Sequence, residues 1–202
     1  MERTEKNSSA MSSAESLAVI EAMINKAKNQ FSENGHLYLL WGWVVFFCSL
    51  IHYLGLRFIK MVEFQYVWLL MLPAVLYTIV YLVKQKKQQK VTTYTDEVLG
   101  AIWMAFGVTI CISGFVIGQT MGTEFYKLLN PIYLGIYGVP TFVSGMLLKF
   151  RPLKAGAFFC WGMAVLATFI PVQEHLLLIA LAMAVAWIVP GYRLKQRYVK
   201  QS

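Results

Sequence analysis

Charged residues are scarce in this chain. They make up 14% of its 202 residues, against about a quarter in an average soluble domain, while 58% of the residues are hydrophobic. An ordinary soluble domain is excluded by this balance. Intrinsic disorder is excluded too, because disordered chains are polar and highly charged. The composition therefore indicates an integral membrane protein.

Motifs for catalysis, cofactors and disulfide frameworks are also missing. The three cysteines, Cys48, Cys111 and Cys160, all lie in apolar runs, and no Cys or His pairs have the spacing of a zinc site. The sequence has no glycine-rich phosphate loop, nucleophile elbow or HExxH motif. We therefore expect a non-enzymatic protein with no cofactor.

Long apolar runs are what the sequence does have. A helix needs about 20 apolar residues, at 1.5 Å each, to cross about 30 Å of hydrocarbon. Six runs approach this length, and we expect an all-α, polytopic bundle of six transmembrane helices in three hairpins. The transmembrane domain covers about residues 37–192, between an N-terminal tail (1–36) and a basic tail (193–202). The expected spans are 37–56, 66–83, 98–118, 129–148, 155–171 and 176–189. We expect Asn130-Pro131 to open the fourth span and Pro190-Gly191 to end the last.

The basic residues predict the orientation. Six spans put both termini on one side, and 15 of the 18 Lys and Arg then lie on that side; the three others are Arg57, Lys60 and Lys127. Cytoplasmic loops carry this excess, so we expect both termini in the cytoplasm of a bacterial inner (cytoplasmic) membrane. Topology is then enough to explain the net charge of +8 and the basic loop 84–90, although that loop could also bind anionic lipid. We expect no nucleic-acid partner.

An amphipathic helix is expected over about residues 12–31. Ser12 and Glu15 form a capping box, and an apolar stripe follows at steps of three and four residues. The stripe comprises Leu17, Ile20, Ile24, Ala27 and Phe31. The favoured interpretation is a helix in the headgroup region, and the alternative is a docking helix for a soluble partner.

Inside the expected spans there is no Asp, Glu, Lys or Arg, which weakens ion-coupled transport because proton and ion pathways usually place such residues in the bundle. One face of the third span is instead lined with glycine. Four of these glycines are candidates for helix packing: Gly107, Gly114, Gly118 and Gly122. Close packing against the fourth span is the favoured interpretation, and homodimerisation is the alternative.

Two prolines fall within expected spans. Pro73 and Pro140 each remove a backbone donor and permit a kink, and Thr141 marks where a cavity would lie. Proline is also frequent in spans without such a role. Trp41 and Trp43 lie near the cytoplasmic start of the first span, as membrane-interface anchors do.

A metal site is a weaker hypothesis. Cys48 and His52 share one face of the first span, and Glu174 and His175 lie in the outer turn of the third hairpin. Nothing in the sequence makes these four converge. A cysteine in an apolar span usually acts as a small hydrophobe, and His52 fits the membrane interface.

Several motifs run along nearly the whole chain. They are Glu15-Ser16-Leu17, Met23-Ile24, Ala27-Lys28, Phe31, Leu40-Trp41-Gly42-Trp43, Thr93-Tyr94-Thr95-Asp96, Trp103-x-x-Phe106-Gly107, Pro131-Ile132, Phe150-x-Pro152-Leu153 and Pro190-Gly191-Tyr192. With these motifs the chain resembles a family of uncharacterised six-span bacterial inner-membrane proteins. The resemblance implies a location in the cytoplasmic membrane and brings no assigned activity.

The leading functional hypothesis is a non-enzymatic interaction or regulatory protein, with the lipid bilayer and a protein partner or second copy as its partners. The charge-free spans and the amphipathic N-terminal helix support it. The alternative is a small carrier or channel-like transporter of an uncharged or amphipathic solute, which would need a polar cavity at mid-depth.

Overall fold

The computed structural model describes Leu17, residues 35–88 and residues 94–201. Within that part of the chain every regular element is a helix and there is no strand, which confirms the predicted all-α class. Leu17 is helical and exposed. The rest of the predicted amphipathic helix, 12–31, lies outside the described residues.

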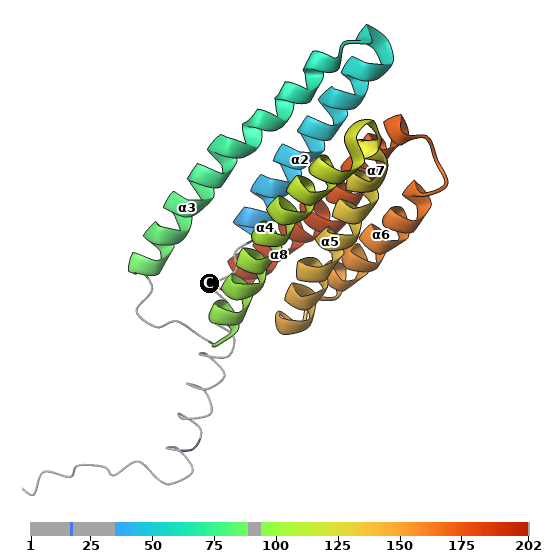
Figure 1. The fold of residues 1–202 in the computed structure, drawn as a ribbon. Helices are drawn as coiled ribbons and strands as arrows, with labels where there is room; N and C mark the ends of the chain where they lie inside the picture. Colours follow the sequence, from blue (N-terminus) through green and yellow to red (C-terminus); the bar gives the residue numbers. More distant parts are fainter. Residues whose placement is uncertain (1–16, 18–34, 89–93, 202) are drawn as a thin grey trace, which may run out of the picture.

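Successive helices run in opposite directions along one axis, except that α7, η5 and α8 form one continuous stretch (Figure 1). In chain order they are α2 (His36–Leu54), α3 (Met71–Gln88), α4 (Tyr94–Met121), α5 (Phe125–Leu147), α6 (Arg151–Ala167), α7 (His175–Met183) and α8 (Val189–Gln201). Two π-helical segments, η1 (Gly55–Ile59) and η5 (Ala184–Ile188), extend α2 and join α7 to α8. Three 3-10 segments connect other helices: η2 (Val62–Leu70), η3 (Gly122–Glu124) and η4 (Val172–Glu174).

Four helical stretches are long and apolar enough to cross a membrane, which supports the expectation of a membrane protein. They are His36–Ile59, Glu63–Lys87, Tyr94–Met121 and Val172–Lys200. The two remaining helices fall short for different reasons. With 17 residues, α6 is about 26 Å long, and α5 contains Asn130, Pro131 and Pro140 among its apolar residues.

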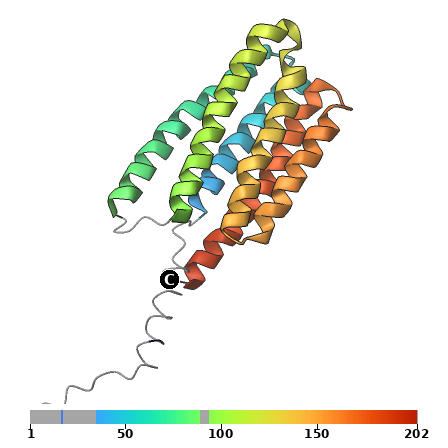
Figure 2. The same ribbon diagram turned by 60° about the horizontal axis from the view of Figure 1, so that its bottom comes forward.

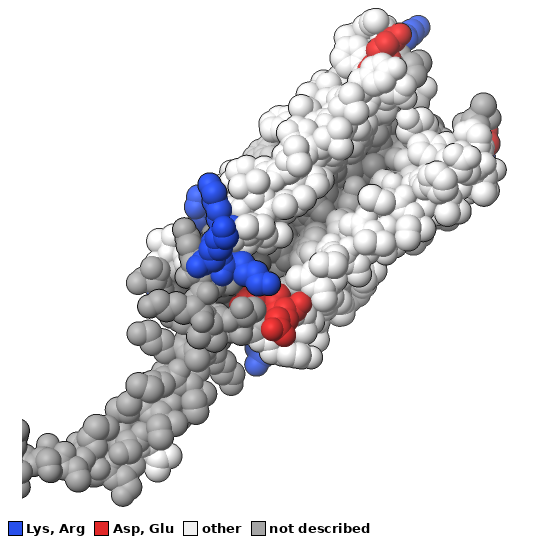
Figure 3. Space-filling view, turned by 60° about the vertical axis from the view of Figure 1, so that its left-hand side comes forward, with Lys and Arg blue, Asp and Glu red and all other residues white. Residues whose placement is uncertain are grey.

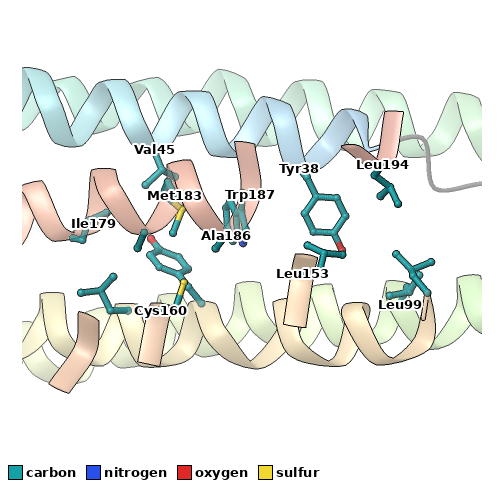
Figure 4. Close-up of a cluster of buried hydrophobic side chains, with 14 of the residues drawn as sticks. Tyr38, Val45, Leu99, Leu153, Cys160, Ile179, Met183, Ala186, Trp187 and Leu194 are labelled. Atoms are coloured by element: carbon teal, nitrogen blue, oxygen red, sulfur yellow. The ribbon is translucent and has the colours of Figure 1, made fainter. Parts of the chain in front are cut away.

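The helices divide into a packed centre and a periphery. The centre consists of α2, α5, α6 and the α7–η5–α8 stretch, whereas α3 and α4 lie along one side (Figures 1 and 2). In the most apolar windows of Glu63–Lys87, which spans η2 and α3, and of Tyr94–Met121 only 6% of residues are buried within the chain, against 50% in Val172–Lys200. Side chains of α2, α6 and the α7–η5 stretch meet in the core, with Trp187 of η5 among them (Figure 4).

Glycine allows η5 to lie close to both of its neighbours. A Cβ added to Gly42 of α2 would be 2.9 Å from Ile188 Cγ1, and one added to Gly156 of α6 would be 2.6 Å from Ala186 Cα. Any side chain at either position would force these helices apart. Because both positions are glycine, η5 packs closely against α2 on one side and α6 on the other.

Two expected helix boundaries are wrong. The Pro190-Gly191 pair does not end a helix, because α8 runs through it to Gln201. A proline crowds the carbonyl one turn before it, and the wider π-helical turn of η5 makes room for that ring. Likewise Asn130-Pro131 does not open a helix: α5 begins at Phe125, immediately after the short turn η3, in which Gly122 adopts a φ of 51°.

Candidate interaction surface between α3 and α4

The middle of the bundle contains a buried polar pair. Thr141 has no exposed surface, and its Oγ1 donates to the Tyr137 carbonyl at 2.7 Å and accepts from Trp187 Nε1 at 2.8 Å. Pro140 beside it is also buried. Both hydroxyl functions of Thr141 are thus used within the contact of α5 with η5. At this position of the expected cavity, the structure has tight packing.

The four candidate metal ligands make other contacts. Cys48 Sγ donates to the Val67 carbonyl at 3.5 Å, and His52 Nδ1 accepts from Trp68 Nε1 at 3.1 Å. At the other site, His175 Nε2 lies 3.2 Å from the Ile170 carbonyl, and Glu174 interacts with the Tyr53 hydroxyl. Among the residues that the structure describes, no three His, Cys, Asp or Glu side chains gather as a metal site would require. Cys48 and His52 instead hold η2 against α2.

The four glycines predicted for helix packing, of which Gly122 lies in η3 and the others on α4, have different surroundings. A Cβ on Gly114 would meet the Tyr133 hydroxyl, and one on Gly118 would lie 3.3 Å from Phe125 Cε2, so both glycines lie against α5. Around Gly107 and Gly122 the space within 4 Å of an added Cβ is open. Of the four glycines predicted for helix packing, Gly114 and Gly118 therefore contact α5.

Side-chain hydrogen bonds attach α3 to α2. Trp41 Nε1 donates to Thr78 Oγ1 at 3.1 Å, while Thr78 donates to the Ala74 carbonyl of its own helix at 2.8 Å. Nearer the start of α2, His36 Nε2 and the Tyr77 hydroxyl are hydrogen-bonded at 2.8 Å. Together with the Trp68–His52 bond, these contacts form a polar seam along α2. Polar side chains can join membrane helices in this way without a large apolar contact.

Pro73 lies where this attachment begins. It is the third residue of α3, directly after the 3-10 segment η2, and it is exposed. Because proline has no N–H, it cannot donate to the Leu69 carbonyl. The chain accordingly changes from 3-10 to α-helical turns at this point. Trp43, the other predicted anchor, stacks on Phe47 at 5.2 Å between ring centroids.

A groove runs between α3 and α4, with α2 beneath it (Figure 3). Two residues on α2 place that helix under both walls. Trp41 reaches α3, as described, and the Tyr38 ring contacts Trp103 of α4 edge-on at 5.5 Å between centroids. Positions three apart on a helix are about 60° apart around its axis, so Tyr38 and Trp41 belong to one face. That face of α2 forms the floor of the groove.

The walls of the groove belong to helices that expose many apolar side chains. On α3 these include Leu72, Leu76, Ile79 and Val80, and on α4 they include Met104, Val108, Ile112 and Phe115.

One end of the groove carries opposite charges on its two walls. The exposed bases Lys84, Lys86 and Lys87 lie in the last turns of α3, and Asp96 and Glu97 lie in the first turn of α4. Figure 3 shows basic and acidic side chains next to each other at this end. This end of the groove thus carries charges of both signs, beside two helices that expose many apolar side chains.

A surface pocket of about 550 Å³ lies away from the groove, between the start of α5 and the connection of α6 to α7. It is mostly apolar, and its polar lining includes Lys127, Thr168 and His175. Lys127 Nζ is 3.5 Å from a carboxylate oxygen of Glu124, and both side chains are well exposed. The pocket therefore offers few fixed polar groups.

Comparison with protein-family models, with curated proteins and with solved structures gives no match for this chain. Its resemblance to an uncharacterised six-span family stays a prediction.

Proposed function

We propose that the chain is a six-span protein of the bacterial cytoplasmic membrane, built from three hairpins with both termini in the cytoplasm. The first described residues of α2 and the end of α8 lie at the same end of the bundle (Figures 1 and 2). At that end are the bases of α3, the Lys149–Arg151 turn and the base-rich α8, and the opposite end has Arg57, Lys60 and Lys127. The positive-inside rule then assigns the base-rich end to the cytoplasm.

Within this membrane the protein acts without catalysis, by binding a partner along α3 and α4. One observation carries the proposal: in the most apolar windows of Glu63–Lys87 and Tyr94–Met121 only 6% of residues are buried within the chain. They flank a groove, whereas the centre is closed by side chains such as Trp187 and Leu134. An apolar groove beside a closely packed core is suited to binding an apolar molecule from the membrane.

The carrier alternative has less support. It needs polar groups that line an opening at mid-depth, and the best placed of them, Thr141, uses its hydroxyl inside a packed contact with Trp187.

Photo-crosslinking in the native membrane tests the binding face. A photoreactive benzoylphenylalanine would replace Leu76 of α3 or Phe115 of α4, which are 65% and 69% exposed. The matched controls are Phe158 and Val165 of α6, at 61% and 63%. We expect α3 or α4 to give one adduct enriched over the membrane's composition, and α6 to give lipid adducts in proportion to that composition. Identical products from all four positions would refute the proposal.

The orientation has its own test. In a cysteine-free background, Lys60→Cys should react with an impermeant maleimide in intact spheroplasts. Lys86→Cys should react only after the membrane is opened. The reverse pattern would show that the proposed topology is inverted.

A further inference from the structure

We propose that the groove between α3 and α4 binds a phospholipid whose headgroup carries a primary amine, the phosphoethanolamine class. The phosphate lies at Lys84 and Lys87, the ammonium at Asp96 and Glu97, and the acyl chains along the apolar walls. This inference rests on the proposed function, because it names the occupant of the same face.

The two charged walls are held near each other by the chain itself. Only residues 89–93 separate Gln88 of α3 from Tyr94 of α4. Six extended residue steps reach at most about 22 Å, so the ends of the two helices must stay within that distance. Figure 3 shows the basic and acidic groups side by side at this end of the groove.

The bases continue an aromatic face of α3. Tyr77, Tyr81 and Lys84 are four and three residues apart, so they share one face of the helix. His36 of α2 contacts this face, at 4.9 Å from the Tyr81 ring and hydrogen-bonded to Tyr77. Amphipathic rings of this kind gather where headgroups meet acyl chains. The order along α3, from apolar residues to aromatic rings to lysines, therefore matches a phospholipid from chain to headgroup.

The acidic wall selects the headgroup. Glu97 is exposed and Asp96 half-buried, and a purely anionic headgroup such as phosphoglycerol would meet their charge with repulsion. A choline headgroup is cationic but has no N–H to donate. An ethanolamine ammonium has three, as a lysine side chain does, and forms charge-assisted hydrogen bonds with carboxylates. Of the three headgroups, only ethanolamine can place a phosphate at the lysines and an N–H donor at the carboxylates.

Lipid competition tests the assignment. The delipidated full-length protein in mild detergent receives equal amounts of dioleoyl phosphatidylethanolamine, phosphatidylglycerol and phosphatidylcholine, and retained lipid is read by native mass spectrometry. We expect ethanolamine lipid to be retained at least fivefold over each of the others. About fivefold is the effect of one contact between opposite charges at a lipid headgroup. Stepwise methylation of its amine should lower retention without any change to the protein.

Variants then assign each wall. Lys84→Gln with Lys87→Gln should lower ethanolamine-lipid retention by about 25-fold, at about fivefold per lysine. Lys149→Gln with Arg151→Gln removes two bases from the turn between α5 and α6 and should leave retention unchanged. Asp96→Asn with Glu97→Gln should abolish the preference over phosphatidylglycerol.

Several results would overturn the inference. Equal retention of the three lipids, a preference for phosphatidylglycerol, or an equal loss in both lysine-wall and control variants would each do so. If crosslinks from positions 76 and 115 still gave an enriched adduct, the proposed binding face would stand and only its lipid occupant would be wrong. If those crosslinks also failed, both proposals would fall.

Discussion

Replacing Gly156 by alanine adds one methyl group where α6 meets η5. The new Cβ would be 2.6 Å from Ala186 Cα, 3.1 Å from Ala186 Cβ and 3.3 Å from the Ala186 carbonyl oxygen. These atoms are backbone or the first side-chain atom, so rotation of a flexible side chain cannot relieve the overlap. One of the two helices must move.

The size of the effect follows from two opposing terms. Overpacking a well-packed contact costs about 1–3 kcal/mol, and alanine in place of glycine within a helix recovers about 0.5–1 kcal/mol. We therefore expect Gly156→Ala to lower the free energy of unfolding by about 1–2 kcal/mol. For a chain of this size that corresponds to a fall in Tm of roughly 2–8 °C.

The same helix provides the control. Gly162 is also on α6, but nothing lies within 4 Å of a Cβ added there. Gly162→Ala should therefore keep only the helix-propensity gain and raise the free energy of unfolding by about 0.5–1 kcal/mol.

The assay is thermal unfolding of both variants in one mild detergent, followed by loss of the monodisperse peak in size-exclusion chromatography. Opposite shifts at Gly156 and Gly162 are the expected result. Equal shifts in unfolding temperature would refute the close packing of η5 between α2 and α6, since the two substitutions differ chiefly in their neighbours.

Further predictions concern polar contacts. Thr141→Val leaves the Trp187 indole N–H buried without its acceptor and should lower the free energy of unfolding by about 1–3 kcal/mol. In detergent unfolding, Thr109→Val is the matched control and should stay within about 0.5 kcal/mol, because that exposed hydroxyl bonds only to its own helix. Trp68→Phe removes the donor to His52 and should increase hydrogen exchange in η2 and α3 but leave α5 and α6 unchanged. If hydrogen exchange in η2 and α3 stayed as slow as in the parent protein, the polar seam would not hold α3 in place.

Composition and run length were sufficient to predict the helical class, and the structure confirms that class. Both are local properties: an apolar run of about 20 residues, unable to leave its backbone unpaired in hydrocarbon, must form a helix. The helix ends were harder to predict. Pro190 predicted a stop, but the π-helical turn of η5, made in contact with Gly42 and Gly156, accommodates its ring.

Most of the candidate site could not be predicted from the sequence, because it depends on contacts between helices that are far apart in the chain. Its floor depends on Trp41 bonding to Thr78, 37 residues away, and on Tyr38 meeting Trp103. Spacing along one helix reveals which residues share a face, but not which neighbour that face meets. Trp41 therefore matched an interface anchor in sequence, whereas the structure shows it joining α2 to α3. The bases at one end of the groove were visible in the loop 84–90, but the sequence did not show that Asp96 and Glu97 lie on the wall beside them.

The polar seam makes the attachment of α3 sensitive to water. The hydrogen bonds from Trp41 to Thr78 and from Trp68 to His52 are strong where water is absent, and they weaken where water competes for the same donors and acceptors. A helix held by apolar packing lacks this dependence. The distance between α3 and α2 should therefore respond to the hydration of the surrounding medium, with α3 close in a thick, dry bilayer and splayed in a small, wet micelle. The choice of detergent would then set the width of the groove before any partner is added.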